Sequence, residues 1–305
     1  MIKEETRMSD LSGKKIGFIG LGLMGRPMCC NLIEAGAQLI VSNRSEPPRT
    51  LMQQHGAASV DSPAEVARRA DTIIIMVSDT QAVDSVLSGP QGVYETIRPE
   101  SLIIDMGTTL LPATRSFAKR AEAKQCFYVD APVSGGTIGA EAGNLTIMAG
   151  GSAQAFTMAL PVLQVLGERI THVGSVGAGQ VAKAANQVIV GLNIGAVAEA
   201  LALAKAAGVD PGKVCEALKG GFADSRILEV HGQRMVKGSF EPGAKSTIQR
   251  KDMHQAIELA AQLDLDMPAT ALSRDLYDQL IAAGGANLDH AALFTVIDRK
   301  KTDSE

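Results

Sequence analysis

Lys183 and Asn186 lie three residues apart in an otherwise apolar stretch, and this spacing places both side chains on one face of a helix. Burial of a lysine lowers its pKa toward the range in which an ammonium group transfers protons near neutral pH. The alternative is a lysine whose ammonium group reaches solvent along its methylene stem. The first interpretation predicts a general acid and base at Lys183, and position alone does not separate the two.

A second chemical signal is the G-x-G-x-x-G pattern of Gly20-Leu21-Gly22-Leu23-Met24-Gly25, which follows a β-rich run and opens a helical pattern. In such a turn Gly20 allows the tight bend, Gly22 lets the backbone approach a pyrophosphate, and Gly25 lets the helix pack against the strand. The anion then lies on the free N–H groups of the helix. The pattern predicts a dinucleotide site at Gly20, Gly22, Leu23, Met24 and Gly25, with a plain strand-to-helix turn as the alternative.

The end of the next strand distinguishes NAD from NADP. An acidic residue there would bind the ribose hydroxyl of NAD, whereas an arginine accommodates the 2′-phosphate of NADP. This sequence has Asn43, Arg44 and Ser45, and Arg44 offers a fixed positive charge with several donors. We therefore expect NADP(H) as the favoured cofactor and NAD(H) as the alternative. The competing interpretation of Arg44 is an exposed residue in a loop.

A third segment, Asp130 to Gly136, has the sequence DAPVSGG and follows a short apolar run. Ser134 offers a hydroxyl, and Gly135 and Gly136 offer unobstructed backbone N–H groups, which together suit a carboxylate. A glycine-rich turn without a ligand is the alternative. The charged pair Lys251-Asp252 begins a later helical stretch and is by itself typical of a solvated face.

The elements that must position these residues are short strands alternating with helical stretches. Continuous apolar runs are typical of strands that helices cover on both faces. The predicted strands are Ile16–Gly20, Gln38–Ser42, Thr72–Val77, Leu102–Met106, Phe127–Asp130, Leu145–Met148 and Ile170–Val173. This alternation predicts an α/β fold with a doubly wound parallel sheet of the Rossmann type.

The second half of the chain changes character after residues 174–179. One long helix is predicted from Gln180 to about Ala207, and its apolar side chains on nearly all faces indicate burial. The stretches that follow have helical patterns, and no strand pattern as strong as those of the first half recurs. We therefore expect a flexible tail over residues 1–13, a dinucleotide-binding Rossmann domain over 14–176, an all-helical domain for substrate binding and oligomerisation over 177–299, and a tail over 300–305.

Composition limits the class of protein. The 305 residues are 46% hydrophobic and 20% charged, which is ordinary for a globular chain, and the net charge of −4 does not favour nucleic acid. The four cysteines show no metal-binding spacing, so no metal site is predicted. The apolar stretch Ala184–Ala198 is too short to span a bilayer, and the N-terminus lacks a signal-peptide core. We expect a cytoplasmic protein that does not bind membranes.

These motifs, taken in order, resemble the β-hydroxyacid dehydrogenase family, which includes 3-hydroxyisobutyrate dehydrogenases. The resemblance covers about residues 14 to 299, and the lysine helix is most similar to that of the tartronate semialdehyde (2-hydroxy-3-oxopropionate) reductases. It implies a Rossmann domain and an all-helical domain joined by a long interdomain helix, assembled as a homodimer or homotetramer. It also implies NAD(P)(H) as the cofactor and a small carboxylate as the substrate.

The resemblance implies a role for each matching position. Lys183 matches the catalytic lysine, and Asn186 matches the residue that holds the substrate beside it. The segment that grips the substrate carboxylate is matched by Ser134, Gly135 and Gly136. The cofactor positions are matched by Val77 and Ser78 along the dinucleotide, Thr108 near the nicotinamide ribose, and Lys251 closing over it.

The sequence departs from the family pattern at three places. Val77-Ser78 stands where relatives commonly have Leu-Pro, Asn43-Arg44 replaces the acid, and Gly107 replaces a more usual serine. Two alternatives from other classes are an imine reductase on the same scaffold and a non-catalytic NADP(H)-binding sensor. Relatives of the first kind usually carry an acid or tyrosine at the lysine position, and those of the second typically lose the lysine. A decarboxylating sugar-phosphate dehydrogenase would need a histidine on the lysine helix, which this helix lacks.

Overall fold

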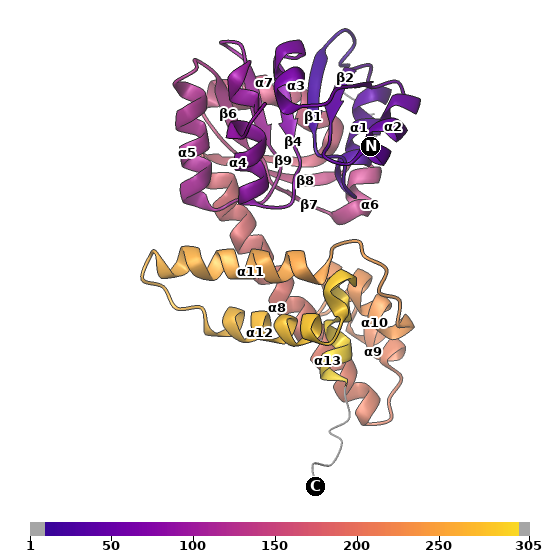
Figure 1. Ribbon diagram of the computed structural model, residues 1–305. Helices are drawn as coiled ribbons and strands as arrows, with labels where there is room; N and C mark the ends of the chain where they lie inside the picture. Colours follow the sequence, from indigo (N-terminus) through magenta and orange to yellow (C-terminus); the bar gives the residue numbers. More distant parts are fainter. Residues whose placement is uncertain (1–9, 299–305) are drawn as a thin grey trace, which may run out of the picture. The chain divides into compact units, whose positions relative to one another are not determined.

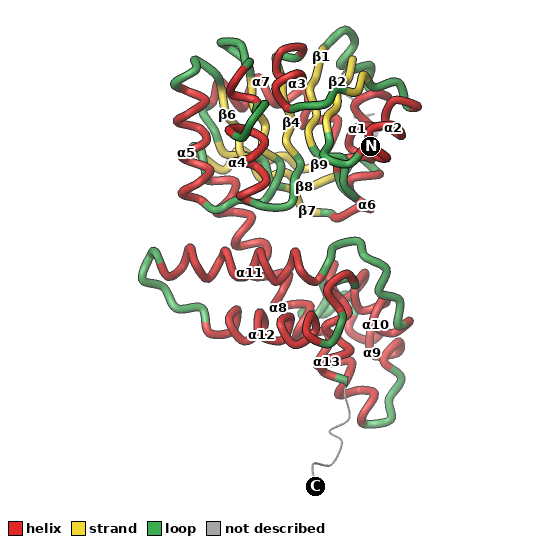
Figure 2. Tube along the Cα trace, viewed as in Figure 1, coloured by secondary structure: helices red, strands yellow, loops and turns green. Residues whose placement is uncertain are grey.

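The computed structural model describes residues 10–298 of the chain, which divide into two compact units between Lys183 and Ala184. The N-terminal unit contains a sheet with helices packed on it, and the C-terminal unit is built from helices (Figure 1). Figure 2 shows the strands confined to the N-terminal unit among the described residues. The predicted Rossmann-type fold followed by helices is therefore confirmed.

The sheet of the N-terminal unit has nine strands in the order β3-β2-β1-β4-β5-β6-β8-β7, with β9 paired to β8. Strands β1 to β6 pair in parallel, β8 runs antiparallel to both β6 and β7, and β9 is parallel to β8. Their bounds are Lys15–Ile19, Gln38–Ser42, Ala58–Ser59, Thr72–Ile75, Leu102–Asp105, Phe127–Asp130, Val133–Ser134, Leu145–Gly150 and Gly167–Gly174.

Both faces of the sheet are buried along β1, β2, β4, β5 and β6, as the apolar strands predict. On β4 the side chain of Ile74 packs in one core cluster, and those of Ile73 and Ile75 pack in another. Each such fully buried side chain contributes roughly 1.5–3 kcal/mol. The covering helices are α1 (Gly25–Glu34), α2 (Glu46–Gln54), α3 (Pro63–Arg69), α4 (Thr80–Ser88), α5 (Leu111–Glu122), α6 (Gly136–Glu141) and α7 (Ala153–Leu166).

The N-terminal tail predicted over residues 1–13 is wrong for its last part. Leu11 is fully buried in the core beside α1, and its N–H donates to the Ala35 carbonyl oxygen at 2.8 Å. An apolar side chain among polar neighbours was enough to anchor this segment. Residues 1–9 and the second predicted tail, 300–305, lie outside the described residues.

Helix α8 (Ala178–Ala206) is 29 residues long, and by length and composition alone it could cross a membrane. The length argument made from Ala184–Ala198 is therefore wrong, because the helix continues well beyond that stretch. Gln180 and Lys183 are buried and bond to backbone carbonyl groups of the N-terminal unit. One helix of this kind is weak evidence for a span, since core helices pass the same test.

The C-terminal unit contains the part of α8 that follows Lys183. It continues with α9 (Pro211–Leu218), a π-helical turn (Leu228–Gly232), α10 (Gln233–Lys237), α11 (Ser246–Ala261), α12 (Pro268–Ala282), two 3₁₀ turns (Gly285–Asn287 and His290–Leu293) and α13 (Phe294–Ile297). The helix predicted to begin at Asp252 begins at Ser246, so Lys251 and Asp252 lie inside it. At this start Ser246 is buried, with its hydroxyl 3.0 Å from the Leu288 carbonyl oxygen and 3.2 Å from that of Asp289.

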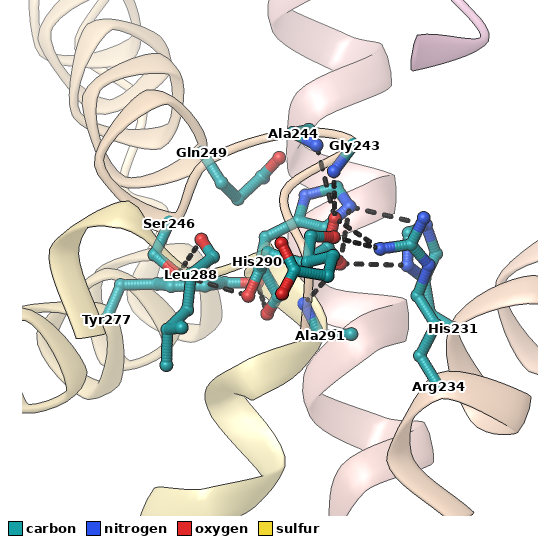
Figure 3. A network of polar contacts seen from close by, with 12 residues as sticks. His231, Arg234, Gly243, Ala244, Ser246, Gln249, Tyr277, Leu288, His290 and Ala291 are labelled. Carbon is teal, nitrogen blue, oxygen red and sulfur yellow. Dashed lines mark hydrogen bonds and ion pairs between the residues drawn. The ribbon is translucent and has the colours of Figure 1, made fainter. Parts of the chain in front are cut away.

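A buried carboxylate joins three segments of this unit (Figure 3). Asp289 is fully buried, and it accepts from the Arg234 guanidinium (3.0 Å to Oδ2) and from the N–H groups of Gly243 (2.9 Å), Ala244 (3.1 Å) and Ala291 (3.1 Å). His231 Nδ1 lies 3.4 Å from its Oδ1. Burial acts to raise the pKa of Asp289, but His231, the charge of His290 and the backbone N–H groups outweigh it. The pKa of this carboxyl therefore lies well below its usual value.

The same cluster has the residue types of a metal site, since ligand atoms of His231, Asp289 and His290 lie within 4.8 Å of one another. The Arg234 guanidinium on the carboxylate opposes a second cation there, and the backbone donors occupy the lone pairs of Asp289. We therefore interpret the cluster as a structural centre.

Replacing Asp289 by asparagine is expected to lower the free energy of unfolding by about 3 kcal/mol at neutral pH, because Arg234 is left without its buried counter-charge. The pKa is depressed in the folded state, so this stabilisation is present above the unfolded pKa of about 4 and is lost as pH falls below it. Urea unfolding at several pH values measures both effects. The exposed Asp266→Asn is the control; an equal loss in the two variants, or a loss that persists in acid, would contradict the interpretation.

Candidate active site

The glycine turn between β1 and α1 is shaped by close packing at two of its glycines and is open at the third. A Cβ on Gly20, whose φ is +105°, would lie 2.2 Å from the Met76 carbonyl oxygen. A Cβ on Gly25 would lie 1.9 Å from the Gly20 carbonyl oxygen. A Cβ on Gly22 would meet nothing within 4 Å. Gly20 and Gly25 thus serve the turn itself, whereas Gly22 borders open space.

The start of α1 fits the pyrophosphate of a dinucleotide. The helix follows Met24 without a side-chain cap and has no acidic residue in its first turn among the described residues. Its first N–H groups and the positive end of its dipole are therefore suited to an anion. Leu23 and Gly22 are exposed beside this helix end. The residues present fit the group that the glycine pattern predicts.

The loop after β2 is tied to the glycine turn by Asn43. Its Oδ1 accepts the N–H of Leu21 at 3.0 Å, and its Nδ2 donates to the Ser45 carbonyl oxygen at 3.0 Å. Arg44 lies between these two bonds and is exposed. The loop therefore holds the backbone around Arg44 while its guanidinium stays accessible.

The turn after β4 lies beside the glycine turn. A Cβ on Gly20 would also lie 2.9 Å from Val77 Cγ1, and one on Gly107 would lie 3.1 Å from the Val77 carbonyl oxygen. Val77 is half-buried, and the exposed Ser78 donates its hydroxyl to Asp79 Oδ2 at 2.7 Å. The carboxyl ends of β1, β4 and β5 therefore meet at one edge of the sheet, where ligands of open α/β sheets bind.

The turn after β5 presents Thr108 between two anchored residues. Gly107 N–H donates to Asp105 Oδ1 at 3.0 Å, and Thr109 is buried with its hydroxyl 2.6 Å from that of Thr114. Thr108 itself is partly exposed. Burial raises the pKa of Asp105 to about 7, although the Gly107 N–H and the Tyr128 hydroxyl oppose this change.

Lys183 lies beside the segment expected to bind a carboxylate. Its side chain is 7% exposed, and Nζ donates to the Val133 carbonyl oxygen at 2.7 Å, directly before Ser134. Gly135 (φ +135°) and Gly136 (φ +60°) have backbone conformations that side chains rarely adopt, so the turn requires both glycines. The structure thus brings the lysine and the Ser134–Gly136 segment together within the N-terminal unit.

Asp130 fixes the start of the lysine helix. Its carboxylate accepts the N–H groups of Gly177 at 2.7 Å and Gln180 at 2.9 Å, so a residue at the end of β6 binds the N-terminus of α8. Burial raises the pKa of Asp130 to about 7, and these N–H groups oppose this change. The same carboxylate therefore aligns α8 with the strand that leads into the Ser134–Gly136 segment.

The C-terminal unit contributes a chain of polar side chains around Asn186. Asn186 Nδ2 donates to Gln187 Oε1 at 2.8 Å, and Gln187 Nε2 donates to Asp252 Oδ2 at 2.6 Å. Asp252 in turn forms an ion pair with Lys251, with 2.7 Å between Nζ and Oδ1. The two predicted residues of this unit, Asn186 and Lys251, are thus joined through the buried Gln187 and Asp252.

Sequence reasoning assigned no role to Gln180, Gln187 or Asp252. Gln180 Oε1 accepts the Thr109 N–H at 3.0 Å, and its Nε2 donates to the Gly107 carbonyl oxygen at 3.0 Å. The available signal was the presence of two glutamines on an apolar helix, because buried amide groups are hydrogen-bonded.

A glycine turn at the carboxyl edge of a parallel sheet and a buried lysine in the same unit are typical of dinucleotide-dependent oxidoreductases. Residues 15–174 match the family described as the NAD binding domain of 6-phosphogluconate dehydrogenase. Residues 177–297 match the family described as NAD-binding of NADP-dependent 3-hydroxyisobutyrate dehydrogenase. Together these matches span both units.

Similar proteins extend the match to whole chains. The chain is 45% identical to the 2-hydroxy-3-oxopropionate reductase of Escherichia coli K12, over 93% of this chain and 97% of that one. It is 35% identical to the 2-(hydroxymethyl)glutarate dehydrogenase of Eubacterium barkeri, over 92% and 94%. The 3-hydroxyisobutyrate dehydrogenase of Mycobacterium tuberculosis, solved with L-serine, is 29% identical with a TM-score of 0.86, over 94% and 99%.

The chain therefore belongs to the 3-hydroxyisobutyrate dehydrogenase family of β-hydroxyacid dehydrogenases. It is an NAD(P)-dependent oxidoreductase that transfers a hydride between the nicotinamide and a small hydroxy acid or the corresponding semialdehyde acid. The predicted family and reaction class are confirmed.

Proposed function

We propose that this enzyme interconverts a small aldehyde acid and its β-hydroxy acid, with tartronate semialdehyde (2-hydroxy-3-oxopropionate) as the first substrate to test. The 2.7 Å hydrogen bond from Lys183 to the Val133 carbonyl oxygen carries this proposal, because it holds an ammonium group beside Ser134. The 45% identity to a reductase of that aldehyde acid supports the choice of substrate.

In this mechanism the substrate carboxylate binds the Ser134 hydroxyl and the N–H groups of Gly135 and Gly136. Lys183 Nζ donates a proton to the carbonyl oxygen in the reductive direction and accepts it from the hydroxyl in the reverse direction. Asn186 follows Lys183 on the same helix and donates a hydrogen bond to Gln187, and in this mechanism its side chain orients the substrate. A bound nicotinamide supplies or accepts the hydride.

The residues proposed to hold the cofactor surround the glycine turn. Gly20, Gly22, Leu23, Met24 and Gly25 form the pyrophosphate cradle, and Asn43, Arg44 and Ser45 surround the adenosine ribose. We further propose that Val77, Ser78 and Thr108 line the nicotinamide side and that Lys251 closes over the cofactor. We favour NADP(H), with NAD(H) as the alternative, because the loop after β2 offers a cation and lacks an acid.

Arg44→Ala is expected to lower the preference for NADPH over NADH about tenfold, measured as the ratio of kcat/KM values. A charged hydrogen bond contributes about 1.5–3 kcal/mol, and exposure of Arg44 places its effect at the low end. The exposed Arg69→Ala in α3 is the control. A ratio that stays at the wild-type value would assign the 2′-phosphate to another group.

The test of the substrate is a steady-state assay that follows the absorbance of the reduced nicotinamide. It pairs NADPH and NADH separately with tartronate semialdehyde, glyoxylate, succinic semialdehyde and methylmalonate semialdehyde. Small pockets discriminate such substrates by about 1–3 kcal/mol, so the highest kcat/KM identifies the preferred acid. Silence with every pair despite NADPH binding would refute the proposal and turn attention to imines or to a sensor role.

We also propose that the enzyme is cytoplasmic and acts as a homodimer or homotetramer. Ile189 and Leu203 on α8 are 65% and 72% exposed, and Leu272 on α12 is 65% exposed. Exposed apolar side chains on packed helices support burial against a second copy.

A further inference from the structure

We infer that Gln180 is a positioning residue that holds the Thr108 turn at a fixed distance from Lys183. The inference rests on the proposed function, in which Thr108 serves the nicotinamide side and Lys183 carries the proton. Gln180 is 3% exposed and precedes Lys183 by three residues on α8, so the two side chains leave the helix on one face.

One side-chain amide anchors the backbone on both sides of Thr108. Gln180 Oε1 accepts the N–H of Thr109 at 3.0 Å, and Gln180 Nε2 donates to the carbonyl oxygen of Gly107 at 3.0 Å. The amide therefore makes one acceptor and one donor bond with the backbone of this turn, as a residue of a neighbouring strand would. All three groups are buried, so the bonds are shielded from competition with water.

The turn is also hydrogen-bonded to the sheet, so its folding does not depend on Gln180 alone. Asp105 accepts the Gly107 N–H from the β5 side, and the Tyr128 hydroxyl donates to the same carboxylate at 3.0 Å. Loss of Gln180 therefore leaves the turn anchored to the sheet. It removes the direct hydrogen bonds from the turn to the helix that carries Lys183, whose start Asp130 still aligns through its bond to the Gln180 N–H.

Placement matters here because hydride and proton must reach the two ends of one carbonyl group. A displacement of about 1 Å in such an arrangement reduces the rate up to about a hundredfold. Gln180 thus sets the distance between the Thr108 turn, on the side of the hydride, and Lys183, which carries the proton, without contacting the substrate. Its loss is expected in kcat rather than in KM.

The experiment compares Gln180→Met, which removes both bonds, with Gln180→Glu, which keeps an acceptor for the Thr109 N–H and lacks the donor to the Gly107 carbonyl. The expected result for Gln180→Met is a kcat about ten- to a hundredfold lower. The KM for the aldehyde acid should change less than about threefold, and the isotope effect with NADPH deuterated at the transferred position should rise. Gln180→Glu should reproduce the fall in kcat, since a carboxylate facing the Gly107 carbonyl oxygen repels it.

The matched control is Tyr94→Phe, which removes another buried side-chain bond of the same unit, from the Tyr94 hydroxyl to the Phe117 carbonyl oxygen at 2.7 Å. A kcat and an isotope effect equal to those of Tyr94→Phe, at a similar Tm, would overturn the inference and leave Gln180 a merely structural residue.

Hydrogen exchange gives a readout that does not depend on turnover. In Gln180→Met the Thr109 amide should exchange faster, β5 should keep its wild-type protection, and NADPH should bind more weakly. If the wild-type enzyme is silent with every aldehyde acid, the proposed function fails, and these measurements still judge Gln180. Faster exchange with weaker NADPH binding would support its role, and unchanged exchange would overturn it.

Discussion

Lys183→Ala is expected to lower turnover about a thousandfold while NADPH binds with near wild-type affinity. The reason is that a general acid contributes about 10²–10⁴-fold to such reactions and the substituted side chain offers no proton. Its ammonium group contacts the Val133 carbonyl oxygen, which directly precedes the segment proposed to bind the carboxylate and is not part of the glycine turn. Steady-state rates combined with a fluorescence titration of NADPH measure the two quantities separately.

The control for this variant is Lys119→Ala, which removes an exposed lysine from the last turn of α5. It should leave both turnover and NADPH affinity unchanged. A Lys183→Ala enzyme that kept more than about a tenth of wild-type turnover would remove Lys183 from the proton transfer. Asp105 and Asp130, whose pKa values burial raises to about 7, would then be the next candidates.

Gly22→Val is expected to weaken NADPH binding about ten- to a hundredfold and to leave the Tm nearly unchanged. The added side chain meets no protein atom near its Cβ, so folding tolerates it, but it enters the space proposed for the pyrophosphate. The loss corresponds to about one charge-assisted hydrogen bond from the backbone, roughly 1.5–3 kcal/mol. Titration with NADPH and thermal unfolding of the free enzyme measure the two effects.

The comparison variant is Gly25→Ala, whose Cβ would lie 1.9 Å from the Gly20 carbonyl oxygen. This substitution should lower the Tm of the free enzyme, because the backbone of the turn has to move. The two glycines of one motif thus separate into a binding role and a folding role. Equal stability loss in both variants, with NADPH affinity unaffected in Gly22→Val, would contradict this division.

The fold could be predicted largely because its strands are continuous apolar runs. The β4 strand lies inside the predicted stretch Thr72–Val77. Its side chains are buried on both faces of the sheet, and this burial is why the stretch is apolar without alternation. The two-residue strand β7 and the antiparallel direction of β8 could not be predicted. Both depend on how the chain returns after β6, which no local pattern specifies.

The candidate site divides in the same way. The glycine turn is local, so its residue types sufficed to predict it. The partners of Gln180 are some 70 positions away in the sequence, at Gly107 and Thr109, and no spacing rule links them. Gln187 likewise bonds to Asp252, 65 positions away. Such residues become visible only when the chain is folded.

The division of the chain directly after Lys183 has a consequence for how the enzyme can change. Lys183, the Ser134–Gly136 segment and the glycine turn belong to one compact unit, within which Asp130 and Gln180 hydrogen-bond to neighbouring segments. Each of these hydrogen bonds joins residues that precede Ala184, so substitutions in α9 to α13 remove none of the bonds that hold Lys183 beside Val133.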